Sequence, residues 1–207
     1  MVLVLTELLG LIVPPRCPVC KGPCAVREPL CARCESQLSP GPPRHTAIAG
    51  IDATWSVAAY EGVARGLVTE LKFRARLGLA SRAAAAIAER APPELLAGEI
   101  VPVPGAPLRR RWRGFDPAEA IAVALATSTG RTVVRCLRRS EGPRQVGRPR
   151  AARVSDPPAV RLRGRAPPAA VLVDDVLTTG ATLAACARAL RSGGSRRVVA
   201  ITFARTP

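Results

Sequence analysis

The sequence predicts an α/β fold around a parallel sheet over residues 51–207, preceded by a small cysteine-rich module over residues 1–50. Val171–Val173 is a short apolar run of the kind that fills a buried parallel strand, and Ala181–Arg191 follows it with apolar residues at helical spacing. In the module, four cysteines stand in two closely spaced pairs. A chain of 207 residues can bury one good core together with such an appendage.

The first part of the main domain reads as alternating strands and helices. Apolar residues recur at regular spacing in four stretches, which predict a strand over Thr54–Tyr60, a helix over Gly62–Phe73, a helix over Leu79–Arg90 and a strand over Glu99–Val103. A further helix is expected to begin after Asp116, which is suited to cap it. Pro117 would take its first position and Glu119 would close a capping box.

A basic loop is expected between the second strand and this helix, over residues 102–115. It contains Arg109, Arg113 and Gly114, and guanidinium groups at a strand end can grip a diphosphate bidentately. The alternative is a solvated basic turn in which Trp112 and Phe115 pack onto the core. We favour the diphosphate interpretation because a second candidate loop at the same sheet edge would bracket the same ligand.

That second loop follows Val171–Val173 and carries the most specific chemistry in the chain. Asp174 and Asp175 provide two adjacent carboxylates that can accept from neighbouring ribose hydroxyls or hold a hydrated Mg²⁺. The hydroxyl groups of three threonines can donate to phosphate oxygens, and a glycine lets the backbone approach a ligand at a helix N-terminus: Thr178, Thr179, Gly180 and Thr182. An ordinary turn with one capping threonine is the alternative, but it needs neither three threonines nor paired carboxylates.

Charge is concentrated in arginine. The formal net charge is +16, and Lys21 and Lys72 are the only lysines among 31 basic residues. This excess can reflect either a G+C-rich genome or a nucleic-acid partner. Lys72 is a candidate for a contact that a guanidinium cannot make, with a chance surface lysine as the alternative. The Arg-rich segment Arg138–Asp156 has little apolar periodicity and is expected to be a mobile loop that either covers a ligand or touches nucleic acid.

The cysteines predict a metal site. Two C-x-x-C pairs stand ten residues apart, a spacing that suits four thiolates around one Zn²⁺: Cys17, Cys20, Cys31 and Cys34. Cys24 is either a spare thiol or a substitute ligand, whereas Cys136 and Cys186 are expected to be small buried hydrophobes. His45 is expected to be solvated in a Pro-rich link. Val2–Val13 is expected to form a short amphipathic helix or buried leader that does not span a membrane, which favours a reducing, cytoplasmic location.

The segment Asp174–Thr182 resembles the phosphoribosyl pyrophosphate (PRPP) loop of type I phosphoribosyltransferases, whose fold is a mainly parallel sheet flanked by helices. The resemblance implies that both aspartates face the ribose and that Thr178, Thr179, Gly180, Ala181 and Thr182 surround the 5-phosphate. Four features together resemble the ComF family of competence-associated proteins: the cysteine module, Lys72-Phe73, V-P-V-P followed by R-G-F, and the motif Asp174–Thr182. Gln145 and Arg153 match that family's Gln and Arg and are candidate lid residues. Asp116-Pro117 replaces the family's Asn-Gln, and Asp156 replaces its Asn.

The leading hypothesis is transfer of a phosphoribosyl group from Mg²⁺-PRPP to an unidentified nucleobase or amine, with release of diphosphate. Lys72, Arg109, Arg113 and Gly114 are the candidates for the diphosphate side, and no catalytic residue can be assigned. The first alternative is a non-catalytic PRPP-binding or DNA-uptake accessory protein acting with a competence translocase. The second is a protein that binds single-stranded DNA through Trp112 and the Arg-rich loop. The sequence leaves oligomerisation open.

Overall fold

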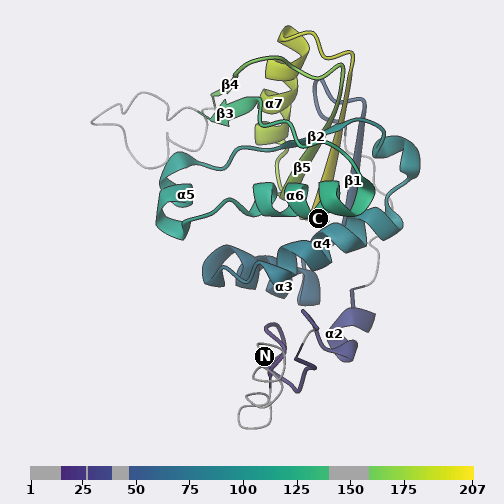
Figure 1. Ribbon diagram of the computed structural model, residues 1–207, viewed down its shortest axis with the longest axis vertical. Helices are drawn as coiled ribbons and strands as arrows, with labels where there is room; N and C mark the ends of the chain where they lie inside the picture. Colours follow the sequence, from purple (N-terminus) through teal and green to yellow (C-terminus); the bar gives the residue numbers. More distant parts are fainter. Residues whose placement is uncertain (1–14, 27, 39–46, 140–158) are drawn as a thin grey trace, which may run out of the picture.

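The computed structural model describes residues 15–26, 28–38, 47–139 and 159–207 (Figure 1). Several features predicted from sequence lie outside the described residues. They are the N-terminal helix over Val2–Val13, the solvated His45, and the lid candidates Gln145 and Arg153.

The main domain is built on a parallel sheet of four strands in the order β1-β6-β5-β2. The strands are β1 (Ala53–Ala59), β2 (Glu99–Pro102), β5 (Ala169–Leu177) and β6 (Arg197–Arg205), and all three neighbouring pairs run parallel. A further parallel bridge joins Ile100 to Val133 at the β2 edge. The predicted α/β fold with a parallel sheet is therefore confirmed.

Helices cover both faces of this sheet (Figure 1). The helices α4 (Gly78–Arg90) and α6 (Pro117–Thr129) share a core with Val171 and Val173 of β5, while α7 (Ala181–Ser192) shares another with Leu172. Successive strand residues point to opposite faces, so a run that is apolar at every position is buried on both. This explains why the first five residues of β5 and most of β6 read as continuous apolar sequence.

The predicted elements are found close to their expected bounds, with three differences. Strand β6 and the antiparallel hairpin of β3 (Leu137–Arg139) and β4 (Val160–Leu162) were not anticipated. The segment expected to be a loop contains a helix, α5 (Pro107–Arg113). It has a local cause: Pro107 occupies the first turn, and Gly114 ends the helix with a φ of 76°. The short 3₁₀ helix η1 (Pro93–Leu95) precedes β2.

The cysteine module packs against α3 (Gly62–Arg74) and also contacts α4, whose Arg82 donates to Glu35 of the module (Figure 1). Leu30 and Leu38 of the module belong to the same buried cluster as Leu67 and Leu71 of α3. A Cβ atom at position 66 would lie 2.6 Å from Val19 Cγ1, so Gly66 is what lets the two approach. The only module helix in the described part of the chain is α2 (Ala32–Ser36).

In the part of the chain that the structure describes, no helix has the length and apolar character needed to cross a bilayer.

Candidate functional site

A cavity of about 340 Å³ opens at the carboxyl ends of the central strands. Its lining residues come from several elements. They lie just after β1 and β2, in the last residues of β5, at the start of α7, and on α3, α5 and β3. Ligands of open α/β sheets bind at this edge, because the strand-to-helix connections converge there.

Most of the site residues predicted from sequence line this one cavity. They are Lys72, Arg109, Arg113, Asp174, Asp175, Thr178 and Thr182. Thr179, Gly180, Ala181 and Gly114 are not among its lining residues. Both aspartates belong to strand β5 and not to the loop in which the sequence placed them. The apolar run predicts the start of this strand, but β5 continues because its ladder with β6 extends to Leu177.

The two aspartates differ in their partners. Asp175 Oδ1 pairs with Lys72 Nζ at 2.9 Å, and its side chain is 10% exposed. Asp174 Oδ1 accepts a hydrogen bond of 2.8 Å from the Asp175 backbone N–H. Burial, followed by the charge of Asp175, raises the pKa of Asp174 well above its usual value. Lys72 thus neutralises Asp175 directly, whereas burial disfavours the charged form of Asp174.

A third carboxyl group, that of Asp116, lies in the same wall. It caps α6 as predicted, since its Oδ1 accepts from Ala118 N at 3.2 Å. Its Oδ2 accepts from Gly105 N at 2.8 Å, and burial raises its pKa. The predicted capping box is not seen, because Glu119 accepts a hydrogen bond of 2.6 Å from Arg135.

Gly105 was not identified from sequence, although it sits in the Pro-Gly turn after β2. A Cβ atom there would lie 2.7 Å from Asp116 Oδ2, so a side chain would break the contact that holds this wall. Arg110 of the predicted basic loop also lines the cavity. Tyr60 and Arg139 line it as well and were not predicted, because the strand end and the hairpin that carry them have no recognisable motif at these positions.

The turn between β5 and α7 brings threonine side chains to a helix N-terminus. Gly180 begins α7 with a φ of 74°, and the Ala181 N–H donates to Thr179 Oγ1 at 3.4 Å. Thr178 and Thr182 place hydroxyl groups in the cavity wall beside the helix N-terminus. A Cβ atom at Gly180 would lie 2.9 Å from Ile48 Cδ1, so this glycine also permits close packing against the chain.

Helix α5 presents Arg109, Arg110 and Arg113 to the cavity. Trp112 on its other side is 76% exposed and meets Phe73 edge-on, with ring centroids 6.5 Å apart. The Arg113 guanidinium lies over the Phe73 ring at 5.1 Å. The suggestion that Trp112 packs onto the core is therefore wrong, whereas Phe115 does pack partly against it.

The second candidate site is the cysteine cluster. The Sγ atoms of Cys17, Cys20, Cys31 and Cys34 all lie within 4.8 Å of one another. A tetrahedral zinc site with Zn–S bonds of about 2.3 Å has S–S edges of about 3.8 Å, so the four thiols fit this ion. Cys24 is not part of the group, and its Sγ donates to the Glu28 carbonyl at 3.4 Å.

The backbone stabilises the thiolate form of one cysteine in the cluster. Burial raises the pKa of Cys17, but hydrogen bonds from the backbone of Cys20, Cys31 and Val19 outweigh it and lower the pKa to about 6. Burial and hydrogen bonds with the other thiols raise the pKa of Cys34. Backbone N–H groups aimed at thiolate sulfur are typical of a structural metal site, because they stabilise the charged ligand.

No protein-family model matches this chain, and no curated protein matches it. Two solved structures are similar to part of it. One is described as the allosteric regulatory enzyme of purine biosynthesis, with 18% identity over 59% of this chain and 24% of its own, and a TM-score of 0.40. The other is glutamine PRPP amidotransferase from B. subtilis complexed with ADP and GMP, with 22% identity over 61% and 26% and a TM-score of 0.38. The chain spans about a quarter of the length of each.

Proposed function

We propose that this protein is a PRPP-binding, phosphoribosyltransferase-like member of the ComF family. The observation that carries the proposal is the cavity itself. Its lining includes both the Asp174-Asp175 pair with Thr178 and Thr182 of the PRPP-loop motif and the arginines of α5. The two segments are more than fifty residues apart in the chain, yet they line one cavity.

The polarity of the cavity suggests how PRPP would lie in it. The 5-phosphate would bind at the N-terminus of α7, where backbone N–H groups and the Thr178 and Thr182 hydroxyls can donate. The ribose hydroxyls would donate to Asp174 and Asp175. The diphosphate would extend toward the guanidinium groups of Arg109 and Arg113, which can bind it bidentately.

Mg²⁺ is proposed as the partner of the diphosphate, and oxygen-rich surroundings suit it. When bound, the ion would supply positive charge for the leaving diphosphate. Lys72 is the one cation paired with the carboxylates among the described residues, so its ammonium is placed to orient Asp175 toward the ribose. The raised pKa of Asp174 adds to the argument, since a bound cation would stabilise the charged form that burial disfavours.

In the proposed reaction, a neutral nitrogen of the acceptor attacks the anomeric carbon of PRPP. The new C–N bond forms as the C–O bond to diphosphate breaks, and the nitrogen releases its proton to solvent. Arg109 and Arg113 would stabilise the charge that develops on the leaving oxygen. Gln145 and Arg153 remain predictions for a lid that excludes water from PRPP.

Two further parts of the proposal rest on the sequence motifs. Cys17, Cys20, Cys31 and Cys34 would hold a structural Zn²⁺, for which their spacing and clustering are suited. The ComF resemblance suggests action in the cytoplasm with a competence translocase and single-stranded DNA during DNA uptake.

The proposal is tested by titrating the purified protein with Mg²⁺-PRPP in a calorimeter and assaying diphosphate release with a panel of nucleobases and amines. Saturable binding with acceptor-dependent release is expected for a transferase. Binding without release under all acceptors would favour the non-catalytic accessory role. If PRPP does not bind, the assignment of the cavity is wrong.

A further inference from the structure

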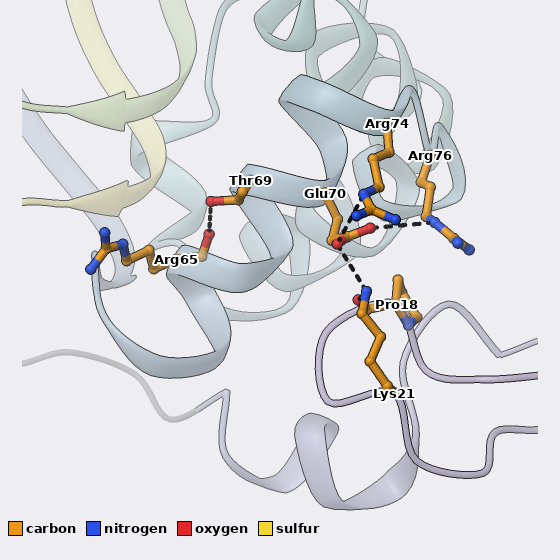
Figure 2. Close-up of polar contacts among 7 residues, drawn as sticks. All are labelled: Pro18, Lys21, Arg65, Thr69, Glu70, Arg74 and Arg76. Atoms are coloured by element: carbon orange, nitrogen blue, oxygen red, sulfur yellow. Dashed lines mark hydrogen bonds and ion pairs between the residues drawn. The ribbon is translucent and has the colours of Figure 1, made fainter.

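The cysteine module and the cavity are connected through α3. On the module side, Lys21 Nζ pairs with Glu70 Oε1 at 2.9 Å and also donates to the Pro18 carbonyl within the knuckle. Figure 2 shows Glu70 at the centre of this contact, with Arg74 and Arg76 on its other side. Lys21 directly follows the predicted metal ligand Cys20. The module therefore contacts α3 through a residue next to its own cysteine cluster.

Glu70 depends on this contact because it is largely buried. Its side chain is 12% exposed, whereas that of Lys21 is 52% exposed. Arg74 Nε and Arg76 Nε lie farther from its oxygens, at 3.6 and 3.5 Å. The Oε2 atom is buried and has no hydrogen-bond partner among the described residues. A carboxylate in such surroundings needs a close cation, and Lys21 is the one at hydrogen-bond distance.

On the cavity side, Lys72 Nζ pairs with Asp175 Oδ1 at 2.9 Å. Lys72 stands two residues after Glu70, which places the two side chains about 200° apart around the helix. Helix α3 therefore contacts the module on one side and a β5 carboxylate on another. The only two lysines of this chain, among 31 basic residues, form these two contacts.

The packing around α3 explains how the module acts on the position of this helix. Helix α3 packs against both the module and α4, so the module is one of the neighbours that fix its position (Figure 1). Val19 of the first knuckle lies so close to Gly66 of α3 that a Cβ atom at position 66 would come within 2.6 Å of Val19 Cγ1. An ion pair and a close apolar contact on one helix face fix both its position and its rotation.

We propose that Glu70, held by Lys21, is a positioning residue that sets the Lys72 ammonium against Asp175, so that the cysteine module controls affinity at the cavity. The ligand part of this inference rests on the proposed function, with Mg²⁺-PRPP as the ligand. Glu70 acts through Lys72 and does not itself line the cavity.

The first test reads the position of Lys72 without any ligand. Because the chain has only two lysines, protein labelled with ¹³C-lysine gives two ε-CH₂ signals, which Lys72→Arg assigns. Glu70→Gln should shift the Lys21 signal and the Lys72 signal together. The matched control is Glu35→Gln, which breaks the other ion pair between module and main domain, where Arg82 Nε of α4 donates to Glu35 Oε1 at 2.6 Å. Helix α4 contributes no lining residue to the cavity among the described residues, so the control should leave the Lys72 signal in place.

The second test measures Mg²⁺-PRPP affinity together with melting temperature and bound metal. Glu70→Gln and Lys21→Met should each weaken binding about tenfold, and the double variant should be no weaker than the worse single one, since both act on one contact. Glu35→Gln should lower the melting temperature to a similar degree while changing affinity less than about twofold. All variants should retain their metal.

The inference is overturned if Glu70→Gln shifts the Lys21 signal alone, or if Glu35→Gln weakens PRPP binding as much as Glu70→Gln does. If the unmodified protein does not bind PRPP, the proposed function fails. The lysine spectra then still decide whether Glu70 positions Lys72.

Discussion

The cysteine cluster and the carboxylate cavity are assembled in opposite ways. All four clustered cysteines come from residues 17–34, and their spacing alone brings the sulfur atoms together. The cavity takes its wall from residues between Tyr60 and Thr182, carried by strands and helices that only the folded sheet brings into contact. A local site can thus be identified from spacing, whereas a distributed site can be identified only where one of its segments carries a motif.

The two sites also differ in how they handle charge. Backbone N–H groups lower the pKa of Cys17 to about 6, so the backbone stabilises the charged form of this thiol. In the cavity, burial raises the pKa of Asp174, and Lys72 pairs with Asp175 alone. Charge in the cluster is thus stabilised by the backbone, whereas charge in the cavity is balanced by a side chain from another element.

The largest effect is expected from the cluster. Cys31→Ser combined with Cys34→Ser should abolish metal binding and lower the melting temperature by about 10 °C, because metal binding contributes directly to folding. Metal content by mass spectrometry and thermal unfolding measure both. Cys24→Ser, outside the cluster, is the control and should keep its metal. A double variant that lacks metal but is as stable as the unmodified protein would rule out a structural role.

The cavity should respond differently, with loss of ligand and no loss of fold. Replacing both Asp174 and Asp175 by Asn should weaken Mg²⁺-PRPP binding by at least about 100-fold, because the ribose hydroxyls and the cation lose their carboxylates. Calorimetry measures the affinity, and circular dichroism checks folding. Glu94→Gln in η1, which precedes β2 at the opposite end of that strand, is the control. Unchanged affinity in the double variant would contradict the assigned ribose contacts.

The smallest effect concerns pH in the absence of Mg²⁺. Because the pKa of Asp174 is raised in the folded protein, folding favours its protonated form, and this contribution is lost as pH rises from about 4 through the raised value. Asp174→Asn cannot ionise and should melt about 2–4 °C above the unmodified protein at pH 8 but not at pH 4. Melting curves from pH 4 to 8 test this.

Asp52 provides a control of opposite sign. Burial raises its pKa, but the Val198 N–H and Arg191 outweigh this and lower it, so its contribution is present at neutral pH and lost in acid. Asp52→Asn should therefore destabilise the protein more at pH 8 than at pH 4. If both variants respond to pH in the same direction, the electrostatic account of the cavity is wrong.

Much of the fold was predictable because its signals are local. The apolar runs predicted β1, β2 and the start of β5, and Asp116-Pro117 predicted the start of α6. Helix α5 could have been recognised from Pro107 and Gly114, which mark its two ends. Strand β6 carries the continuous apolar pattern of a buried strand but no motif, and it was overlooked.

The sequence by itself determined the two motifs and therefore the chemistry of each site. The C-x-x-C spacing positions four thiols because a tight knuckle has few backbone conformations, and the Asp-Asp and threonine motif places its polar groups at a strand-to-helix turn. Only the tertiary structure decided that Lys72 pairs with Asp175 and Lys21 with Glu70. These contacts join segments about fifty to a hundred residues apart. They form because α3 packs against the module and the rest of the main domain, and no local propensity encodes that packing.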